Sequence, residues 1–477
     1  MSKKKSEPIV LNEQKIKALP EYEKLKLEME KPNFFTIMKM EGMEIRHSNF
    51  LAWLLDPNES HNLRELFLKW FLKELILENE QAVIERQLNE YDFFTPEMID
   101  EINWTKVHVH REVSDSNKKN SLDILIVYED AEPKKSFTVS IENKVFSSDH
   151  SDQLTRYKEM VARRRPECLQ CLRNFKGNDL FVYLTLSGDS PTDADDNTRN
   201  SYWLFSYEKI LERIEFILES YRDRMSDKVI LYLSDYRDNL VRNVLDNDPK
   251  LEQLAKDLLE KSNAKNLING ADRSNNPVID RALQYRDDLN EPFKSIIKGK
   301  GYQLAASCDR KYVRFLPKLD DKENETLKRL TDDNKKYYNN YLETLRSVYG
   351  ENIKDNHWPN YELFLFELVI ERSKGMSVGW KASIGPSIYH DDILSNLYRA
   401  IHGEEDSKKS ESSEKSRGRF WHIQTIFSIK GETEEKIKDA LERKITANQE
   451  KIKAIETAFR EWLQTKNPLD LEEVTLQ

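Results

Sequence analysis

The prediction of the fold rests on two β-rich segments, LDILIVY at residues 122–128 and FTVSIENK at residues 137–144. Both are dominated by β-branched and other apolar residues, and the polar residues 129–136 between them are typical of a hairpin connection. A carboxylate interrupts each segment, Asp123 in the first and Glu142 in the second. We therefore predict two consecutive strands, each with a charge where a buried strand prefers an apolar side chain.

Helices and further strands surround this pair. Apolar residues recur at helical spacing over residues 48–77, with a break at Pro57. Residues 107–111 alternate as a strand, and residues 180–186 form a continuous apolar run typical of a buried strand. Further helices are predicted at residues 149–164, 207–221 and 228–245. This order of elements predicts an α/β fold.

The second half of the chain predicts a different unit. An Asn-, Ser- and Gly-rich segment at residues 263–276 indicates a linker, and residues 404–417 are of low complexity and predict a disordered surface loop. Strand-like runs lie at residues 301–304, 312–316, 363–370, 377–384 and 420–429, and one long charged helix is predicted at 432–464. The predicted divisions are an N-terminal helical lead (1–33), an α/β domain (34–250), a helical linker (251–290), an α+β domain of unknown role (291–431) and a C-terminal helix (432–477).

The composition is that of a folded, water-exposed protein. A chain of 477 residues exceeds one ordinary core and predicts two or three domains. Charged residues make up 34%, yet 20 Tyr, 20 Phe and 8 Trp supply enough apolar surface for real cores. The three cysteines show no disulfide-framework spacing, which indicates a reducing compartment. No apolar run approaches the ~18 residues of a membrane span, so we expect a cytoplasmic protein without a membrane partner.

The charge is unevenly distributed. A net charge of −10 argues against a protein that coats nucleic acid non-specifically. Residues 153–176 have the opposite balance, because only Glu159 and Glu167 are acidic there. The basic residues of this segment are Arg156, Lys158, Arg163, Arg164, Arg165, Arg173 and Lys176. An acidic chain with one such segment is compatible with local contact to nucleic acid.

Asp123 and Glu142 on neighbouring strands would repel each other unless a cation neutralised them. Mg²⁺ suits such a pair, because it binds one or two carboxylates, keeps several waters and takes phosphate oxygens. Lys144 follows Glu142 by two residues and therefore projects from the same strand face, where it could orient a water or stabilise charge at phosphorus. The alternative is a salt-bridged pair of strands on a solvated face. These three residues alone do not exclude it.

The surrounding residues strengthen the first interpretation. Ser121-Leu122-Asp123, followed after a short gap by Glu142-Asn143-Lys144, resembles the motif of the PD-(D/E)XK nuclease superfamily, with Leu122 in place of the proline. EIRHSNFLAWLLDP at residues 44–57 resembles the opening of a bacterial branch of this superfamily. QLTRY at residues 153–157 is similar to the Q-x-x-x-Y helix of the RecB-type exonucleases. The resemblance covers about residues 34–245.

The resemblance implies a restriction-endonuclease-like mixed β-sheet flanked by helices, and attack of metal-activated water on a phosphodiester. The implied ligands of Mg²⁺ or Mn²⁺ are Asp123, Glu142, the backbone carbonyl of Asn143 and, as a further ligand or orienting residue, Glu44. Lys144 would be the catalytic lysine, acting with Asp123 and Glu142. The implied nucleic-acid-binding residues are Gln153, Tyr157, Arg156, Lys158, Arg163 and Arg164.

DNA is the favoured substrate, with a role in DNA processing or in bacterial defence against foreign DNA, including antiviral defence. The alternative is a catalytically silent protein that binds nucleic acid or regulates on the same fold. Asp123, Glu142 and Lys144 are all present, whereas silent members usually lose one. A homodimer would allow both strands to be cut, and the C-terminal region is a candidate for a regulatory contact.

Other chemistry-bearing residues have structural interpretations. Cys168-x-x-Cys171 lacks a second pair at zinc spacing, so a structural or incidental role is the expectation. His108 and His110 share one face of a strand and are expected to form a surface pair.

The remaining candidates lie on helices or in cores. Ser48 is predicted to cap a helix that begins at Asn49, with His47 packing beside it or facing substrate. Helical spacing places Trp53, Phe67, Trp70 and Phe71 in a core. Core packing is also the expectation for Trp358, Trp380 and Trp421, rather than stacking on bases.

Overall fold

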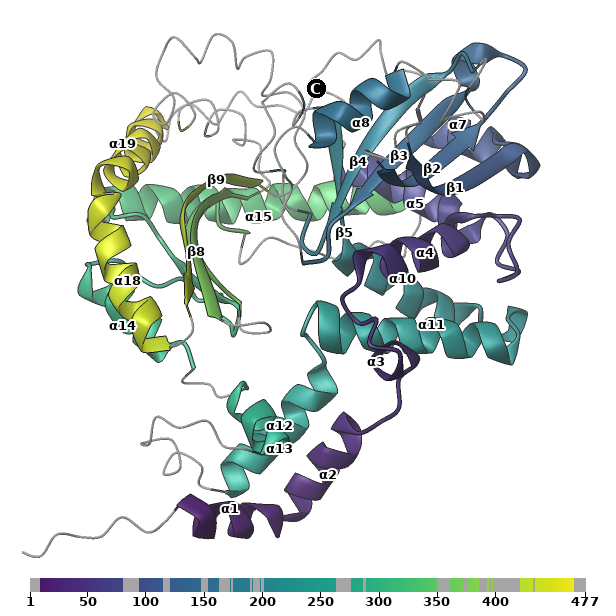
Figure 1. Cartoon of the computed structure of the whole chain (residues 1–477). Helices are drawn as coiled ribbons and strands as arrows, with labels where there is room; N and C mark the ends of the chain where they lie inside the picture. The colour runs from purple at the N-terminus through teal and green to yellow at the C-terminus, as the bar shows by residue number, and fades with distance from the viewer. Residues whose placement is uncertain are drawn as a thin grey trace, which may run out of the picture.

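The structure is a computed structural model of the whole chain (Figure 1). It describes residues 9–79, 94–114, 121–146, 153–162, 175–188, 201–262, 276–285, 289–349, 361–371, 376–385, 421–431 and 434–466, with the single residues Leu172, Pro191, Thr198, Ile393 and Leu397. The described residues form two β-sheets with their own helices, and a helical cluster beside them.

The first sheet has five strands in the order β1-β2-β3-β4-β5. Their bounds are β1 Val107–Ser114, β2 Ser121–Tyr128, β3 Phe137–Asn143, β4 Asn178–Thr185 and β5 Tyr202–Ser206. The pairs β1–β2 and β2–β3 are antiparallel, whereas β3–β4 and β4–β5 are parallel. The predicted mixed sheet is confirmed. β5 is missing from the sequence prediction, because its five residues run directly into a helix that Ser206 caps.

Helices cover both faces of this sheet, and strand alternation assigns each side chain to one face. Ile124, Ile126 and Ile141 lie in the larger core, beneath α4 (Glu44–Leu55), α5 (Leu66–Glu78), α10 (Tyr207–Ser220) and α11 (Asp227–Asn239). The intervening Leu125 and Val127 lie in the smaller core with α8 (Gln153–Ala162). Figure 1 shows α8 over one face of the sheet and α4 and α10 on the other side.

Most helices predicted for this half are confirmed. α4 and α5 match the predicted helical residues 48–77, and α10 and α11 match the two later helices. The π-helical turn η5 (Leu240–Val244) continues α11. Short elements complete the unit: α3 Phe34–Ile37, α7 Pro96–Glu101, and the 3₁₀ turns η1 Trp104–Lys106, η2 Pro133–Lys135 and η4 Arg222–Arg224. No helix in the described parts of the chain is long and apolar enough to cross a membrane.

The second sheet is antiparallel, with four strands in the order β6-β7-β8-β9. Its strands are β6 Tyr312–Phe315, β7 Phe364–Glu371, β8 Met376–Ile384 and β9 Trp421–Gly431, and its helices are α14 Glu291–Gly299, α15 Asp321–Tyr349, α18 Glu434–Ala447 and α19 Gln449–Thr465. Together they enclose a core of their own around Trp380 and Phe459. The predicted second α+β region is confirmed.

Three details of this region differ from the sequence prediction. Residues 301–304 do not form a strand, since only Leu304 makes an isolated bridge, to Phe315. The single C-terminal helix is two helices, which meet at Asn448. The 29-residue helix α15 has no counterpart in the prediction, because its sequence is mostly charged and polar.

A fourth core lies between helices from the N-terminus and helices from the middle of the chain. The N-terminal helices α1 (Ile9–Lys17) and α2 (Pro20–Met29) pack against α12 (Pro249–Lys261) and α13 (Pro277–Leu283). Leu25 and Leu258 are buried between them. The predicted lead and the predicted linker are therefore partners in one helical cluster, and the exact domain boundaries stay a prediction.

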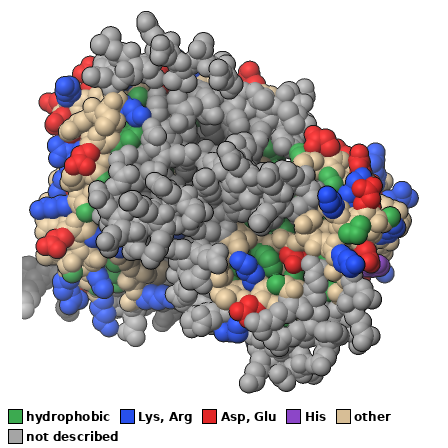
Figure 2. Space-filling model, turned by 90° about the horizontal axis from the view of Figure 1, so that it is seen from above, with side chains coloured by type: hydrophobic (Ala, Val, Ile, Leu, Met, Phe, Trp, Pro, Cys, Tyr) green, Lys and Arg blue, Asp and Glu red, His purple; other side chains and the backbone are tan. Residues whose placement is uncertain are grey.

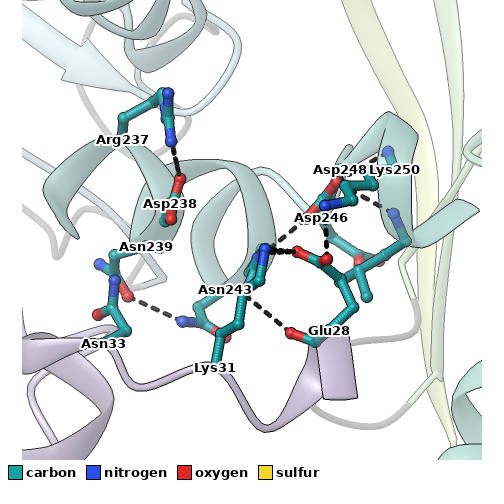
Figure 3. Close-up of polar contacts among 12 residues, drawn as sticks. Glu28, Lys31, Asn33, Arg237, Asp238, Asn239, Asn243, Asp246, Asp248 and Lys250 are labelled. Carbon is teal, nitrogen blue, oxygen red and sulfur yellow. Dashed lines mark hydrogen bonds and ion pairs between the residues drawn. The ribbon is translucent and has the colours of Figure 1, made fainter. Parts of the chain in front are cut away.

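An ion-pair cluster at Glu28 holds this helical unit to the end of α11 (Figure 3). Glu28 accepts hydrogen bonds from Arg242 Nη2 at 2.7 Å, and its carboxylate lies 2.8 Å from Lys31 Nζ and 2.7 Å from Lys250 Nζ. Arg242 also binds Asp248 through Nε at 2.9 Å. Because Glu28 and Asp248 are buried, these contacts fix the N-terminal helices relative to η5 and α12.

Asp246 makes the corresponding contact with the second sheet. Its carboxylate binds Arg281 Nη2 at 2.7 Å and Arg310 Nη1 at 2.8 Å. Lys311, next to Arg310 and just before β6, donates to the carbonyl of Leu245. The segment that follows α11 is therefore tied to both the helical cluster and the α+β region.

Candidate active site

Two of the predicted catalytic residues, Glu142 and Lys144, lie at the C-terminal end of strand β3 and directly after it. Ile141 faces the larger core, so alternation turns Glu142 and Lys144 towards α8 and Asn143 towards α4 and α10. The printed contacts agree with this assignment. Glu142 Oε1 lies 2.8 Å from Lys144 Nζ and accepts from Gln153 of α8 at 3.0 Å. The predicted common face of Glu142 and Lys144 is therefore confirmed.

Asp123 reaches the same place from β2. The last cross-strand pair between β2 and β3 is Ile124 with Ile141, so the next pair along would be Asp123 with Glu142. Instead of continuing the ladder, Asn143 N–H donates to Asp123 Oδ2 at 2.8 Å. The two strands separate where both carry a carboxylate.

Glu142 is the most deeply buried charge of the group. Its side chain is only 2% exposed, and Lys144 and Gln153 both donate to Oε1. The buried Oε2 has no hydrogen-bond partner among the described residues. A buried carboxylate oxygen without a donor is costly, because nothing replaces the water it has lost.

The electrostatics of the two carboxyls follow from this burial. Burial raises the pKa of Glu142 to about 8, and the charge of Asp123 acts in the same direction against the opposing effect of Lys144. Burial also raises the pKa of Asp123 to about 6, although the Asn143 N–H and Lys144 act to lower it. Without a further cation, both carboxyls hold their protons more tightly than free side chains do.

Gln153 connects the carboxylate to the lysine. Its Oε1 accepts from Lys144 Nζ at 3.3 Å, and its Nε2 donates to Glu142 and to the Tyr157 hydroxyl, at 2.7 Å for the latter. Gln153 and Tyr157 lie one helical turn apart on the same face of α8, as predicted. In the structure Gln153 binds the side chains of Glu142 and Lys144, and the Tyr157 hydroxyl accepts from Gln153. A contact of Gln153 or Tyr157 with the phosphodiester stays a prediction.

Glu44 lies at the first position of α4 and closes the site from the other side. Its Oε1 accepts from the backbone N–H groups of Val145 at 2.9 Å and Phe146 at 3.2 Å. This carboxylate therefore fixes the chain directly after Lys144. Both roles predicted for Glu44, as an orienting residue and as a metal ligand, stay predictions.

Ser48 does not cap a helix, so that prediction is wrong. Helix α4 begins at Glu44, and Ser48 lies within it, where its hydroxyl donates to the Glu44 carbonyl at 3.0 Å. The same hydroxyl accepts from Asn143 Nδ2 at 3.0 Å. His47 is fully buried and packs between helices, as one of its two predicted roles required.

The contacts of the Asn143 side chain are a feature of this site that the sequence prediction misses. It is 1% exposed, and its Oδ1 accepts from the Tyr207 hydroxyl at 2.8 Å. Its Nδ2 donates to Ser48 and to the Glu44 carbonyl at 3.3 Å. These partners lie on α4 and α10, and no spacing in the sequence indicates that they meet.

The donor set fits a hard divalent cation. Asp123 and Glu142 are carboxylates at the point where β2 and β3 separate, and one Glu142 oxygen lacks a donor among the described residues. No group of three or more His, Cys, Asp or Glu side chains in the described ranges is placed to hold a metal ion. Mg²⁺ does not need such a cage, since one or two carboxylates, waters and substrate oxygens complete its shell.

The basic residues of the site are only partly described. Arg156 is exposed on α8, one turn from Gln153, and Lys158 is half-buried. Arg163 and Arg164 lie outside the described residues. Figure 2 shows basic and acidic side chains interspersed over the described surface on this face of the molecule. The predicted electrostatic contact with nucleic acid therefore stays a prediction.

The features set aside have the expected places where the structure describes them. Phe67 and Phe71 are buried in the larger core, with Trp53 and Trp70 packed against it, and Trp380 is buried in the second core. The rings of His108 and His110 lie 6.5 Å apart on β1. Trp358, Cys168 and Cys171 lie outside the described residues, as does the side chain of Trp421.

A sequence profile of the PD-(D/E)XK nuclease superfamily matches residues 32–238. This span contains α4, the whole first sheet, α8 and α10. The predicted resemblance to this superfamily is therefore confirmed for residues 32–238, and the restriction-endonuclease-like fold predicted for this domain is confirmed. Members are typically nucleases, and they generally use divalent metals. Comparison with curated proteins and with solved structures finds no match.

Proposed function

We propose that the protein is a metal-dependent nuclease that hydrolyses phosphodiester bonds, with DNA as its substrate. The observation that carries this proposal is the carboxylate pair of Asp123 and Glu142, beside Lys144 and with Glu142 Oε2 lacking a partner in the described part of the chain. A salt-bridged strand pair would satisfy both oxygens of a buried glutamate. This site instead leaves one carboxylate oxygen open and raises the pKa of both acids.

Asp123, Glu142 and the backbone carbonyl of Asn143 would hold Mg²⁺ or Mn²⁺. Such an ion lowers the pKa of a bound water and stabilises charge on the phosphate. Burial acts to lower the pKa of Lys144, but the neighbouring acids Glu142, Glu44 and Asp123 together raise it, so Lys144 keeps its proton. Its ammonium group would orient the attacking water or stabilise the charge that develops at phosphorus.

Gln153 and the helix that carries it extend the site towards substrate. Gln153 fixes the positions of Glu142 and Lys144, and Arg156 one turn later is exposed on the same helix. An exposed arginine beside the catalytic group is suited to contact with a phosphate of the nucleic-acid backbone. A role for Lys158, Arg163 and Arg164 in the same contact belongs to this proposal.

The test is cleavage by wild type and by Glu142→Gln, assayed on linear, circular and single-stranded DNA and on RNA with Mg²⁺, Mn²⁺ or EDTA. Wild type should cut DNA only with a divalent ion, and Glu142→Gln should lower the rate by at least about 10²-fold. Glu132→Gln is the matched control, because Glu132 is exposed in the connection between β2 and β3 and should leave the rate unchanged. Undiminished cleavage by Glu142→Gln would contradict the proposal.

The same experiment separates the alternatives. Nucleic-acid binding without cleavage under any of these conditions would favour the catalytically silent protein. Preferential cleavage of RNA would show that DNA is not the preferred substrate, and the proposed metal-dependent hydrolysis of phosphodiester bonds would stand. A homodimer, a regulatory contact through the C-terminal region, a cytoplasmic location and a role in defence against foreign DNA remain predictions from the sequence.

A further inference from the structure

A buried hydrogen-bond network lies behind the proposed metal site, on the face of the sheet opposite to α8. Its centre is the Asn143 side chain, whose backbone stands between the two proposed acidic ligands. Tyr207 and Ser48 bind this amide from α10 and α4. All three side chains are at most 1% exposed. The network therefore connects two helices to Asn143, whose peptide N–H donates to Asp123.

The orientation of the Asn143 amide is fixed by its partners. The carbonyl of Glu44 is only an acceptor, so the atom of Asn143 that lies 3.3 Å away must be Nδ2. Oδ1 then faces Tyr207, whose hydroxyl donates at 2.8 Å. Each side of the amide consequently has a complementary partner. With the side chain held in this way, the Asn143 peptide has little freedom to rotate away from Asp123.

A second layer supports the first. His47 Nε2 lies 2.9 Å from the Glu41 carbonyl and must donate to it, which leaves Nδ1 to accept from the Tyr236 hydroxyl at 3.0 Å. Burial lowers the pKa of His47 to about 4, so this neutral tautomer persists at physiological pH. Asn239 Nδ2 also donates to the Glu41 carbonyl, at 3.2 Å. These contacts fix the turn that carries Glu44 into the site.

We propose that Tyr207 and Ser48 are positioning residues for metal binding, which act through the Asn143 side chain to hold its peptide between Asp123 and Glu142. The inference rests on the proposed nuclease function. It concerns residues on the face of the sheet opposite to α8, which would set the metal affinity of the proposed site. Partners of this kind, one step removed from the ligands, typically change metal affinity or activity 10–100-fold when they are removed.

The test is binding of Mn²⁺ alone to the full-length protein, followed by the loss of the electron paramagnetic resonance signal of free Mn²⁺. Tyr207→Phe removes one hydroxyl and should weaken Mn²⁺ binding about 10-fold. Tyr128→Phe is the matched control. Tyr128 is also buried, and its hydroxyl donates to Asp130 at 2.6 Å, but it lies at the far end of β2 from Asp123. Its affinity should equal that of wild type.

A second pair of variants separates positioning from general loss of stability. Ser48→Ala should also weaken Mn²⁺ binding, and its effect should not add to that of Tyr207→Phe, because both act on one amide. The double variant Tyr207→Phe with Tyr128→Phe should bind Mn²⁺ as weakly as Tyr207→Phe alone, because Tyr128→Phe does not change the affinity. A lower melting temperature with unchanged Mn²⁺ affinity in Tyr207→Phe would show that Tyr207 only stabilises the fold, and would overturn the inference.

The two proposals fail in different ways. If wild type binds Mn²⁺ and Glu142→Gln does not, but Tyr207→Phe and Ser48→Ala bind normally, only the positioning role is wrong. If wild type binds no Mn²⁺, or if Glu142→Gln binds it as wild type does, the metal site itself is wrong and the positioning role falls with it.

Discussion

Each of the two sheets buries a glutamate in one of its central strands, and the two glutamates differ in how many of their carboxylate oxygens have a hydrogen-bond donor. Glu367 on β7 is 2% exposed, and Arg314 on β6 binds its Oε1 at 2.8 Å while Ser383 on β8 donates to its Oε2 at 2.7 Å. Glu142 on β3 is equally buried, but Lys144 and Gln153 share one oxygen and the other is without a donor in the described structure.

The difference separates a structural carboxylate from one prepared for a ligand. The neighbouring strands supply a donor to each carboxylate oxygen of Glu367, so this buried group needs no further ligand. Glu142 faces the like charge of Asp123 and keeps a raised pKa of about 8. A buried carboxyl with one oxygen lacking a donor is a candidate for function, because its raised pKa means that the ionised form becomes favourable only when a cation binds.

The largest expected effect concerns the structural carboxylate. Arg314→Met leaves Glu367 buried without its cation and should lower the free energy of unfolding by about 3–5 kcal/mol. Cleavage per folded molecule should be unchanged at temperatures well below unfolding. Urea denaturation and a rate measurement on the same preparation test both points. The double variant Arg314→Met with Glu367→Gln should recover part of the loss, and an equal or greater loss would contradict the charge argument.

Removing Lys144, the cation beside Glu142, should lower the cleavage rate and leave the stability of the fold almost unchanged. Lys144→Met should lower the cleavage rate about 10²–10³-fold, because the charge that develops in the transition state loses a donor. Unfolding should change little, since Glu142, with its raised pKa, can take up a proton in response. Single-turnover cleavage and a thermal melt distinguish the outcomes. A variant that unfolds like Arg314→Met but cuts like wild type would place Lys144 among the structural residues.

The sequence predicted the parts of the site that follow from local spacing. Glu142 and Lys144 share a strand face because they are two residues apart, and Gln153 and Tyr157 share a helix face because they are four apart. The same reasoning found α4 and the strands β1 to β4. Each of these depends only on the period of the strand or helix.

The remaining features depend on contacts that no period encodes. Tyr207 lies 64 positions from Asn143, and Ser48 lies 95 positions from it, so their meeting is a result of the packing of α4 and α10 on the sheet. Ser48 looked like a helix cap because serine is a favoured cap residue and stands just before the apolar run that begins at Phe50. The helix α15 was missed because a charged surface helix shows little apolar periodicity.

A smaller effect is expected at Gln153. Gln153→Ala should lower kcat about 10-fold, because Glu142 and Lys144 each lose one hydrogen bond while the proposed ligands remain. The comparison is Arg156→Ala on the same helix, which should instead weaken substrate binding and reduce its dependence on salt. Steady-state kinetics at two salt concentrations separate kcat from KM. A Gln153→Ala variant that changes only KM would assign Gln153 to substrate contact.

The smallest effect is the pH dependence of stability without metal. The folded-state pKa values of Asp123 and Glu142, about 6 and about 8, lie above those of the unfolded chain, so folding takes up protons between pH 4 and 8. The associated stability is present at low pH and is lost as the pH rises through these values.

In EDTA, wild type should therefore be less stable at pH 8.5 than at pH 6 by at least about 1 kcal/mol, relative to Glu142→Gln. Mg²⁺ should restore stability mainly at the higher pH, since it binds the ionised carboxylates and competes with protons. Thermal melts at the two pH values, with Mg²⁺ or EDTA, measure both the pH dependence of stability and the stabilisation by Mg²⁺. If the stability of wild type and of Glu142→Gln depends on pH in the same way, Glu142 does not have a raised pKa in the folded protein. The distinction between Glu142 and Glu367 is then lost.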